Sequence, residues 1–295
     1  MTLSQTSTET GSRRVVVIIP TYNEVENLPV AVAGTRAAVP FADVLVVDDR
    51  SPDGTGVVAD GLAAVDPRVQ VLHRAAKEGL GAAYRDAFGW ALDRGYDVVV
   101  EMDADGSHDP RDLPRLLAAL GGADLVLGSR WVDGGAVVDW PRWRRVLSRG
   151  GNLYARLMLR LPVGDATGGF RAFRSDVLRV LPLGEVSSAG YCFQVDLVFR
   201  TVRAGFRVRE VPITFRERTR GDSKMSGSIV VEALAKVTLW AVTNRDASAR
   251  RGAGANRRDR SAQVGFEPYT AGSQNGSPAA IMVATTKPAG PLPSM

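Results

Sequence analysis

Five short apolar runs, separated by segments with a helical pattern, constrain the fold of this chain more than any other feature. Their residues are apolar at successive positions, which suits strands buried on both faces, as in a parallel sheet covered by helices. The runs are VVVII at 15–19, VLVV at 44–47, VQVL at 69–72, VVVE at 98–101 and LVLG at 125–128. The segments near 24–38, 54–65, 80–94 and 110–120 are predicted to form the connecting helices. This alternation predicts an α/β fold with a doubly wound, mainly parallel sheet.

The rhythm changes after residue 130, and no internal repeat is present. The pattern predicts a loop rich in Trp and Arg at 131–145, helices near 145–160 and 191–204, and a strand near 206–213. We expect one domain over 13–243. The flanking segments 1–12 and 244–295 contain few large apolar residues to offset the entropy lost on ordering, so both are predicted to be disordered.

Composition narrows the class of protein. With 295 residues, 45% of them hydrophobic and 23% charged, the chain is neither collagen-like, nor a coiled coil, nor wholly disordered. A single cysteine, Cys192, excludes an internal disulfide and fits a reducing compartment. Two histidines, His73 and His108, cannot build a histidine-rich zinc site. The formal charge of +5 favours an anionic partner, such as a nucleotide, a phosphate, a nucleic acid or an acidic lipid surface.

Membrane-spanning and secreted classes are disfavoured. No apolar run approaches the roughly 20 residues that a spanning helix needs. The best candidate, 229–243, is shorter and carries Glu232 and Lys236, so we predict an amphipathic helix there. The N-terminal residues lack the apolar core of a signal peptide. We therefore expect a cytoplasmic protein.

Acidic side chains follow two of the predicted strands. Glu101, Asp103 and Asp105 end the fourth run, where alternation and the following turn aim carboxylates at one point. Taken alone, they would more often be a helix cap before the next helix, with exposed acids in a turn. Asp48 and Asp49 end the second run, where carboxylates accept hydrogen bonds from ribose hydroxyls or a base edge. Two acidic strand ends in one sheet favour a nucleotide and a hard cation, Mg²⁺ or Mn²⁺, that shares its ligands with substrate phosphates.

Other nucleotide motifs are incomplete. The run from Gly79 to Tyr84 begins like G-x-G-x-x-G, but its third glycine is replaced by tyrosine and it follows the third strand. No P-loop motif occurs. Nicotinamide, flavin and P-loop chemistry are therefore disfavoured, and we interpret the two glycines as a turn at the start of a helix.

Several longer runs together resemble one family. They are VVVIIPTYNE, VVDDRSPDGT, MDADGSHDP, LGSR, WPRWRRVLSRGGN, DATGGFRAFR and FRERTRGDSK, in consistent order from about 14 to 240. This set resembles the polyprenol-phosphate (dolichol-phosphate) mannose synthases, which are inverting family-two glycosyltransferases. The resemblance implies a GT-A-type fold.

The resemblance also implies roles for individual residues. The nucleotide pocket would be lined by Pro20, Tyr22 and Glu24, with base and ribose contacts completed by Val47, Asp48 and Asp49. The sugar nucleotide would be held by Asp103, Ala104 and Asp105. Asp103 and Asp105 would bind the metal together with Ser107, which stands where some members have glutamine. The donor and acceptor phosphates would meet Arg130, Arg218 and Lys224, which with Asp105 form the implied catalytic set.

The function implied is metal-dependent, inverting transfer of mannose from GDP-mannose to a polyprenyl phosphate. Without a spanning helix, the enzyme would bind the inner face of the cell membrane peripherally, through the basic and Trp-containing stretch 140–149 and the amphipathic segment 229–243. The alternatives are glucosyl or N-acetylhexosaminyl transfer from a UDP-sugar, a nucleotidyltransferase, and a basic nucleic-acid-binding protein. Carboxylates at two strand ends would repel nucleic-acid phosphates, so we expect no nucleic-acid partner.

Two details remain open at this stage. His108 suits either a metal ligand or a capping group beside the acidic turn. Gln194 and Asp196 lie two positions apart on a predicted helix, so they do not share a face, and one of them is expected to point toward the donor sugar.

Overall fold

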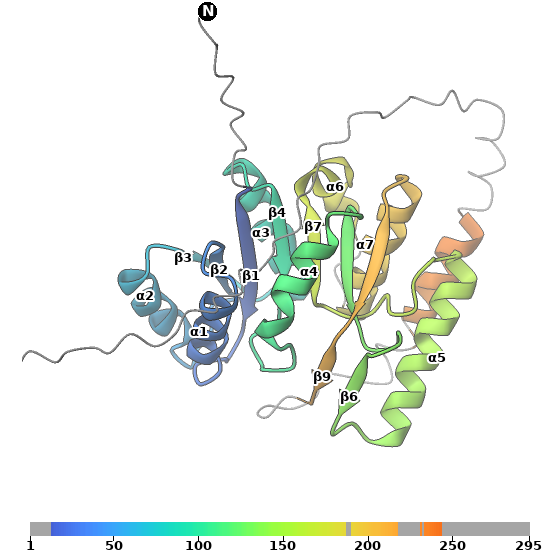
Figure 1. The fold of residues 1–295 in the computed structure, drawn as a ribbon, viewed down its shortest axis with the longest axis horizontal. Helices are drawn as coiled ribbons and strands as arrows, with labels where there is room; N and C mark the ends of the chain where they lie inside the picture. Colours follow the sequence, from blue (N-terminus) through green and yellow to red (C-terminus); the bar gives the residue numbers. More distant parts are fainter. Residues whose placement is uncertain (1–12, 187–189, 218–230, 232, 244–295) are drawn as a thin grey trace, which may run out of the picture.

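The central feature of the fold is a seven-stranded sheet of order β3-β2-β1-β4-β7-β5-β8. The computed structural model describes residues 13–186, 190–217, 231 and 233–243 (Figure 1). All neighbouring pairs are parallel except those of β7, which runs antiparallel to both β4 and β5. The strands are β1 (Val15–Thr21), β2 (Asp43–Asp48), β3 (Val69–His73), β4 (Val98–Glu101), β5 (Leu125–Ser129), β7 (Arg171–Arg174) and β8 (Val208–Pro212). A second, two-stranded sheet pairs β6 (Ala136–Val138) with β9 (Thr214–Arg216).

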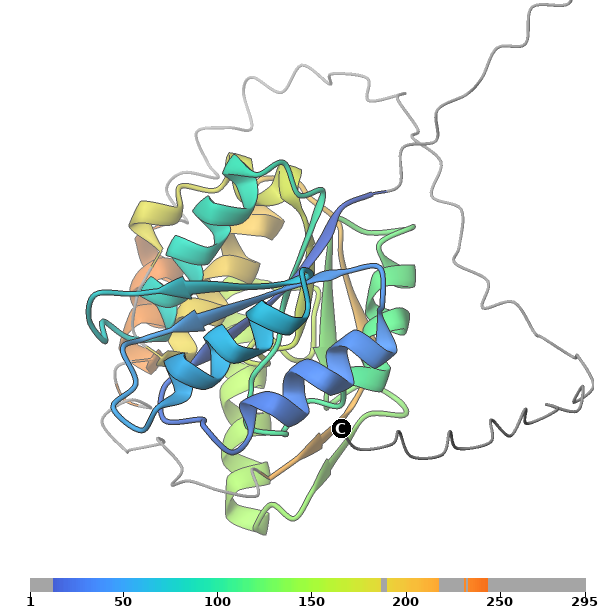
Figure 2. The same ribbon diagram turned by 90° about the vertical axis from the view of Figure 1, so that its left-hand side faces the viewer.

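Helices cover both faces of the large sheet (Figure 2). One apolar cluster joins alternate strand residues to α1 (Leu28–Ala38), α2 (Thr55–Val65) and α4 (Leu113–Ala119). The other joins the opposite strand faces to α3 (Leu80–Asp93), α5 (Arg142–Leu159), α6 (Ser175–Val180) and α7 (Gly190–Arg203). Short 3₁₀ turns occupy Pro110–Asp112 and Leu183–Glu185, and residues 233–243 are helical. The core therefore lies in two layers, as expected for strands that are apolar on every residue.

The five predicted strands and four connecting helices are confirmed, with ends that shift by a few residues. The strand expected near 206–213 is confirmed as β8, which ends at Pro212. The next strand, β9, was not predicted and pairs with β6. The predicted loop 131–145 contains β6 and the start of α5. Two further elements, β7 and α6, were not predicted. The segments 1–12 and 244–295 lie outside the described residues.

The carboxyl ends of the parallel strands meet at one edge of the sheet. Thr21 at the end of β1 pairs with Asp48 at the end of β2, and Glu101 at the end of β4 lies beside Ile18. Arg171 on antiparallel β7 lies between Glu101 and Leu127. The register thus brings the acidic strand ends to the same edge, as the sequence predicts.

Candidate active site

The loops after β1 and β2 are joined into one unit at this edge. The amides of Asn23 and Val25 donate to Ser51 Oγ (3.1 Å) and Asp53 Oδ2 (3.2 Å). The Glu24 amide donates to a threonine hydroxyl at the start of α2 (2.9 Å). Two φ angles, 60° at Asn23 and 57° at Arg50, mark sharp turns. The residues predicted for nucleotide binding are therefore held by paired loops.

Within this unit, Asp48 and Asp49 have different partners. Asp48 accepts from the Ser51 hydroxyl (2.6 Å) and amide (3.2 Å), which fixes its carboxylate in a local turn. Asp49 forms a buried ion pair with Arg74, whose side chain is only 4% exposed. Arg74 had not been singled out from the sequence. Any ribose contact by Asp49 would share the carboxylate with this guanidinium.

The remaining residues predicted for the nucleotide pocket occupy partly buried and fully buried positions. The Tyr22 ring lies 3.4 Å from Lys77 Nζ, and Glu24 accepts from an asparagine side chain (2.8 Å). Pro20 is partly buried. The Val47 side chain is fully buried in the core cluster on the α3 side of the sheet. With its side chain in the core, Val47 has only its backbone left for the predicted base and ribose contact.

The acidic turn after β4 brings together the residues predicted for a metal. The Ser107 amide donates to Asp105 Oδ1 (3.0 Å), and Gly106, at φ 76°, permits the sharp turn between them. Asp105 and Ala104 are buried, whereas the Asp103 side chain is 33% exposed. The hydroxyl of Ser107 is buried and has no hydrogen-bond partner in the part of the chain that the structure describes. Two carboxylates and an orphaned hydroxyl are hard oxygen donors, so this turn fits Mg²⁺ or Mn²⁺ with substrate phosphates or water completing the shell.

His108 holds this turn through a hydrogen bond to its backbone and through ring packing. Its Nδ1 accepts a hydrogen bond from the Asp103 amide (3.1 Å), and its ring stacks on Phe170 (4.9 Å) and meets the edge of Phe215 (5.5 Å). The lone pair on Nδ1 is thereby used by the backbone. Within the described ranges, no three side chains of His, Cys, Asp or Glu gather into a group that would hold a metal ion by themselves. The capping interpretation of His108 is the one that this geometry supports.

A buried polar cluster lies beneath the acidic turn. Gln194 on α7 donates from Nε2 to Glu101 Oε2 (2.9 Å), while Asp196 turns away to pair with Arg200 (2.8 Å). Gln194 is therefore the one that reaches the strand end, although its contact is Glu101. Burial raises the pKa of Glu101 to about 7, and the nearby charge of Arg171 and the Gln194 hydrogen bond oppose this only in part.

We expect the Glu101→Gln variant to change how stability depends on pH. Because the folded-state pKa is raised from 4.5 to about 7, the wild type loses unfolding free energy as pH rises between these values, by up to about 3 kcal/mol. Glutamine does not titrate, so the variant should not lose unfolding free energy over this pH range. Urea unfolding at pH 5 and pH 8 measures the difference, with Glu185→Gln, at an exposed glutamate, as the control. An equal pH dependence in variant and wild type would contradict the assignment.

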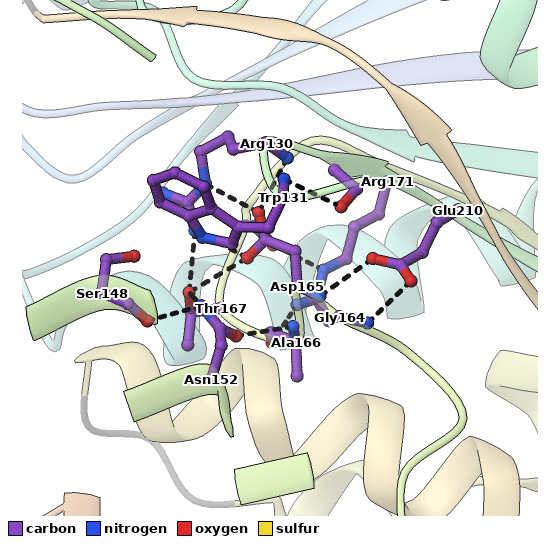
Figure 3. Close-up of polar contacts among 12 residues, drawn as sticks. Arg130, Trp131, Ser148, Asn152, Gly164, Asp165, Ala166, Thr167, Arg171 and Glu210 are labelled. Atoms are coloured by element: carbon purple, nitrogen blue, oxygen red, sulfur yellow. Dashed lines mark hydrogen bonds and ion pairs between the residues drawn. The ribbon is translucent and has the colours of Figure 1, made fainter. Parts of the chain in front are cut away.

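Arg130, just after β5, forms a buried ion pair with Asp165 (Figure 3). Its Nε and Nη2 donate to the two carboxylate oxygens, each at 2.7 Å, and Nη2 also donates to the Thr167 hydroxyl (2.8 Å). Burial raises the pKa of Asp165, but the charge and hydrogen bonds of Arg130 outweigh it and keep that pKa below its ordinary value. The predicted phosphate-binding cation is thus anchored to a carboxylate.

Aromatic rings and further donors surround Arg130. Its guanidinium carbon lies 5.7, 5.5 and 5.4 Å from the rings of Trp131, Trp140 and Phe215. Arg144 lies on the first turn of α5, and its buried guanidinium is 4.2 Å from the ring centroid of Trp140, which precedes the helix. Among the described residues, the Nε atom of Arg144 and the Nε1 atoms of both tryptophan indoles are buried donors without a partner. Unpaired buried N–H groups are costly, so this donor cluster suits an oxygen-rich anion.

Phe215 connects this donor cluster to the acidic turn. Its ring meets both His108 (5.5 Å) and Trp140 (5.3 Å). The amide of Arg216 donates to the Ser107 carbonyl (3.2 Å), so β9 ends beside the acidic turn. The predicted phosphate ligands Arg218 and Lys224 follow β9 in the chain and lie outside the described residues.

Comparison with known proteins identifies the family. The model described as "Glycosyl transferase family 2" matches residues 16–181. The chain belongs to this family. It is a glycosyltransferase, and the matched residues include the acidic turn, Arg130 and Asp165.

Two curated relatives share more than half of their aligned residues with this chain. A protein from Micrococcus luteus named undecaprenyl-phosphate mannosyltransferase is 59% identical over 232 residues, which cover 79% of this chain and 96% of the relative. A protein from Mycolicibacterium smegmatis named polyprenol monophosphomannose synthase is 56% identical over 237 residues, which cover 79% of this chain and 89% of the relative. The resemblance to polyprenol-phosphate mannose synthases is thereby confirmed.

Solved structures share the fold of this family-2 domain. Glucosyl-3-phosphoglycerate synthase from Mycobacterium tuberculosis has a TM-score of 0.57 at 18% identity, covering 77% of this chain and 80% of that one. A mannosyltransferase from Pyrobaculum calidifontis has a TM-score of 0.51 at 19% identity, and the match covers 84% of this chain and 77% of that one. The predicted GT-A-type fold is confirmed.

Proposed function

We propose that this family-2 enzyme transfers mannose from GDP-mannose to a polyprenyl phosphate, with inversion at the anomeric carbon and with the help of a divalent cation. The observation that carries the proposal is the 59% identity to a protein named undecaprenyl-phosphate mannosyltransferase, over nearly the whole of that protein. The Pyrobaculum mannosyltransferase, which has the same fold, was solved with GDP-Man and Mn²⁺. Its ligands support the choice of donor and metal.

Asp103, Asp105 and Ser107 would hold the cation. Bound there, it would offset the charge that develops on the leaving nucleotide diphosphate. Asp103 and Asp105 do not cap the next helical element, because the 3₁₀ turn at Pro110–Asp112 is capped by Asp109. Metal binding would give the two carboxylates a function.

The donor cluster around Arg130 and Arg144 would bind the acceptor phosphate, with Arg218 and Lys224 as further cations. An acceptor phosphate oxygen attacks the anomeric carbon, a C–O bond forms there, and the bond to the nucleotide β-phosphate breaks with its electron pair leaving on GDP. One displacement inverts the centre. A phosphate monoester with a second pKa near 6 is largely dianionic at neutral pH, so no general base is needed. The cations reduce the repulsion between acceptor and donor phosphates.

A panel assay tests this proposal. Purified protein is incubated with GDP-mannose, GDP-glucose, UDP-glucose or UDP-N-acetylglucosamine, each radiolabelled in the sugar, together with a short polyprenyl phosphate and Mg²⁺ or Mn²⁺. Mannose is expected in the lipid extract with GDP-mannose alone, and chelation is expected to remove it. If the label enters the lipid extract from a UDP-sugar instead, the proposed mannosyl transfer is wrong and the enzyme is a glucosyl or N-acetylhexosaminyl transferase.

We also propose that α5 docks on the bilayer that holds the acceptor. A bilayer-crossing helix is absent from the residues that the structure describes. Trp143, Val146, Leu153 and Leu157 are 54–71% exposed and recur at the spacing of one helical stripe. A neighbouring stripe carries exposed arginines at 142, 145, 149 and 156. Apolar insertion beside cations suits an anionic membrane surface.

The helix at 233–243 extends this face. It lies beside α5 in both views (Figures 1 and 2), and the Tyr154 and Thr238 hydroxyls are 2.6 Å apart. Leu239 and Val242 are exposed on it. Val237 and Ala241 on the same helix are buried. The amphipathic character of 229–243 stays a prediction.

Replacing two stripe residues, Val146→Ser with Leu157→Ser, is expected to weaken binding to anionic vesicles about tenfold or more, because each buried side chain contributes roughly 1.5–3 kcal/mol. The control is Val57→Ser with Val65→Ser, two equally exposed valines on α2. Vesicle flotation measures binding, which should also fall as salt is raised. A wild type that does not float at low salt would exclude this docking face.

A further inference from the structure

The segment 164–169, between α5 and β7, has no regular secondary structure, yet buried side chains hold its backbone. Glu210 on β8 accepts hydrogen bonds from its first two amides, at 2.7 and 2.9 Å. Arg171 on β7, which is fully buried, donates to two of its carbonyls, each at 2.7 Å. So many satisfied backbone groups indicate a loop with one defined position.

The helix α5 holds the same segment through Asn152 (Figure 3). Its Oδ1 accepts from the amide that follows Asp165 (2.9 Å), and its Nδ2 donates to the Thr167 hydroxyl (3.0 Å) and to the Ser148 carbonyl (3.0 Å). The Thr167 hydroxyl also accepts from Arg130 (2.8 Å) and lies 3.2 Å from Asp165 Oδ1. Thr167 is thus the junction between α5 and the buried ion pair.

The far end of the segment lies against the acidic turn. A Cβ built on Gly169 would lie 3.7 Å from both carboxylate oxygens of Asp103 and from the His108 ring. A Cβ on Gly168 would lie 3.2 Å from the Gly128 carbonyl. The backbone here is therefore one wall of the space that Asp103 occupies, and a shift of the segment would move that wall.

We propose that Asn152 and Thr167 are positioning residues, through which α5 fixes the segment 164–169 and thereby the geometry of the Asp103–Asp105 turn. Among the described residues, neither side chain contacts the carboxylate of Asp103 or that of Asp105. They act through the backbone that packs on Asp103. The inference deepens the proposed function and rests on it, because it treats the acidic turn as the donor site.

The test uses Thr167→Val, which removes the hydroxyl but keeps the shape. Thr167→Ser restores the hydroxyl. Thr201→Val is the matched control, since Thr201 is buried on α7 and its hydroxyl donates to the Leu197 carbonyl of the same helix (2.7 Å). Asn152→Leu is the second variant. Hydrogen exchange followed by mass spectrometry reports the peptides covering 101–108 and 164–169, and initial rates give KM for the sugar nucleotide.

In Thr167→Val and Asn152→Leu, exchange is expected to rise about tenfold in both peptides, since buried donors lose their acceptor. KM for the donor should rise about tenfold as well, and Thr167→Ser should return both values toward wild type. A merely structural role predicts faster exchange at 164–169 alone, with 101–108 and KM unchanged, and would overturn the inference. Exchange is measured without substrate, so a wild type that transfers no mannose refutes the proposed function while leaving this test intact.

Discussion

Asp105→Asn is expected to lower the rate of mannosyl transfer by at least about 10³-fold, equivalent to about 4 kcal/mol of barrier. Asparagine keeps the oxygen that accepts from the Ser107 amide, so the turn retains its hydrogen bond. It removes the negative charge that a divalent cation needs from the most buried carboxylate of the turn. The loss should therefore appear in turnover and in the affinity for Mn²⁺, and not in the fold.

The measurement is lipid-extractable label from GDP-mannose, at Mn²⁺ concentrations that saturate the wild type. Thermal unfolding establishes that the variant is folded. The matched control is Asp176→Asn, an 81% exposed carboxylate on α6, for which unchanged rates are expected. Turnover equal to wild type in a folded Asp105→Asn protein would refute the metal assignment of this turn.

The fold was predictable because the strands of the parallel sheet are buried on both faces. Val16, Ile18 and their neighbours leave no ambiguity between strand and amphipathic helix. The antiparallel strand β7 was missed because its four residues, RAFR, begin and end with arginine. Arg171 is nevertheless fully buried, since its donors meet backbone carbonyls that are invisible in a sequence pattern.

The acidic turn was predictable for a different reason. Its carboxylates and Ser107 are close in sequence, and a strand end delivers them together. The partners that hold the site come from distant positions: Arg130 and Asp165 are 35 residues apart, and Gln194 and Glu101 are 93 apart. Nothing in the spacing of one chain links such pairs. The only sequence signal is an isolated charge in an otherwise small and apolar stretch, as at Asp165 in DATGGF.

The ion pair between Arg130 and Asp165 carries the largest expected effect on stability. Arg130→Met removes the cation but leaves a carboxylate that is completely buried. Breaking a buried pair from one side typically costs about 3–5 kcal/mol, because the remaining charge has no compensation. Urea unfolding at pH 7 measures this loss. A change below about 1 kcal/mol would mean that water reaches Asp165 and that the pair contributes little.

The pH dependence separates this cause from simple loss of packing. In the wild type the pKa of Asp165 is lowered, so the pair stabilises the fold above the unfolded-state value of 3.8 and its contribution fades as pH falls through the folded-state value. In Arg130→Met, burial is no longer opposed by the guanidinium and the pKa rises. The destabilisation should then be full at neutral pH and diminish as acid protonates Asp165. Adding Asp165→Asn to Arg130→Met removes the uncompensated charge, so the double variant should be more stable at pH 7 than Arg130→Met alone, whereas a pure packing defect would make it less stable.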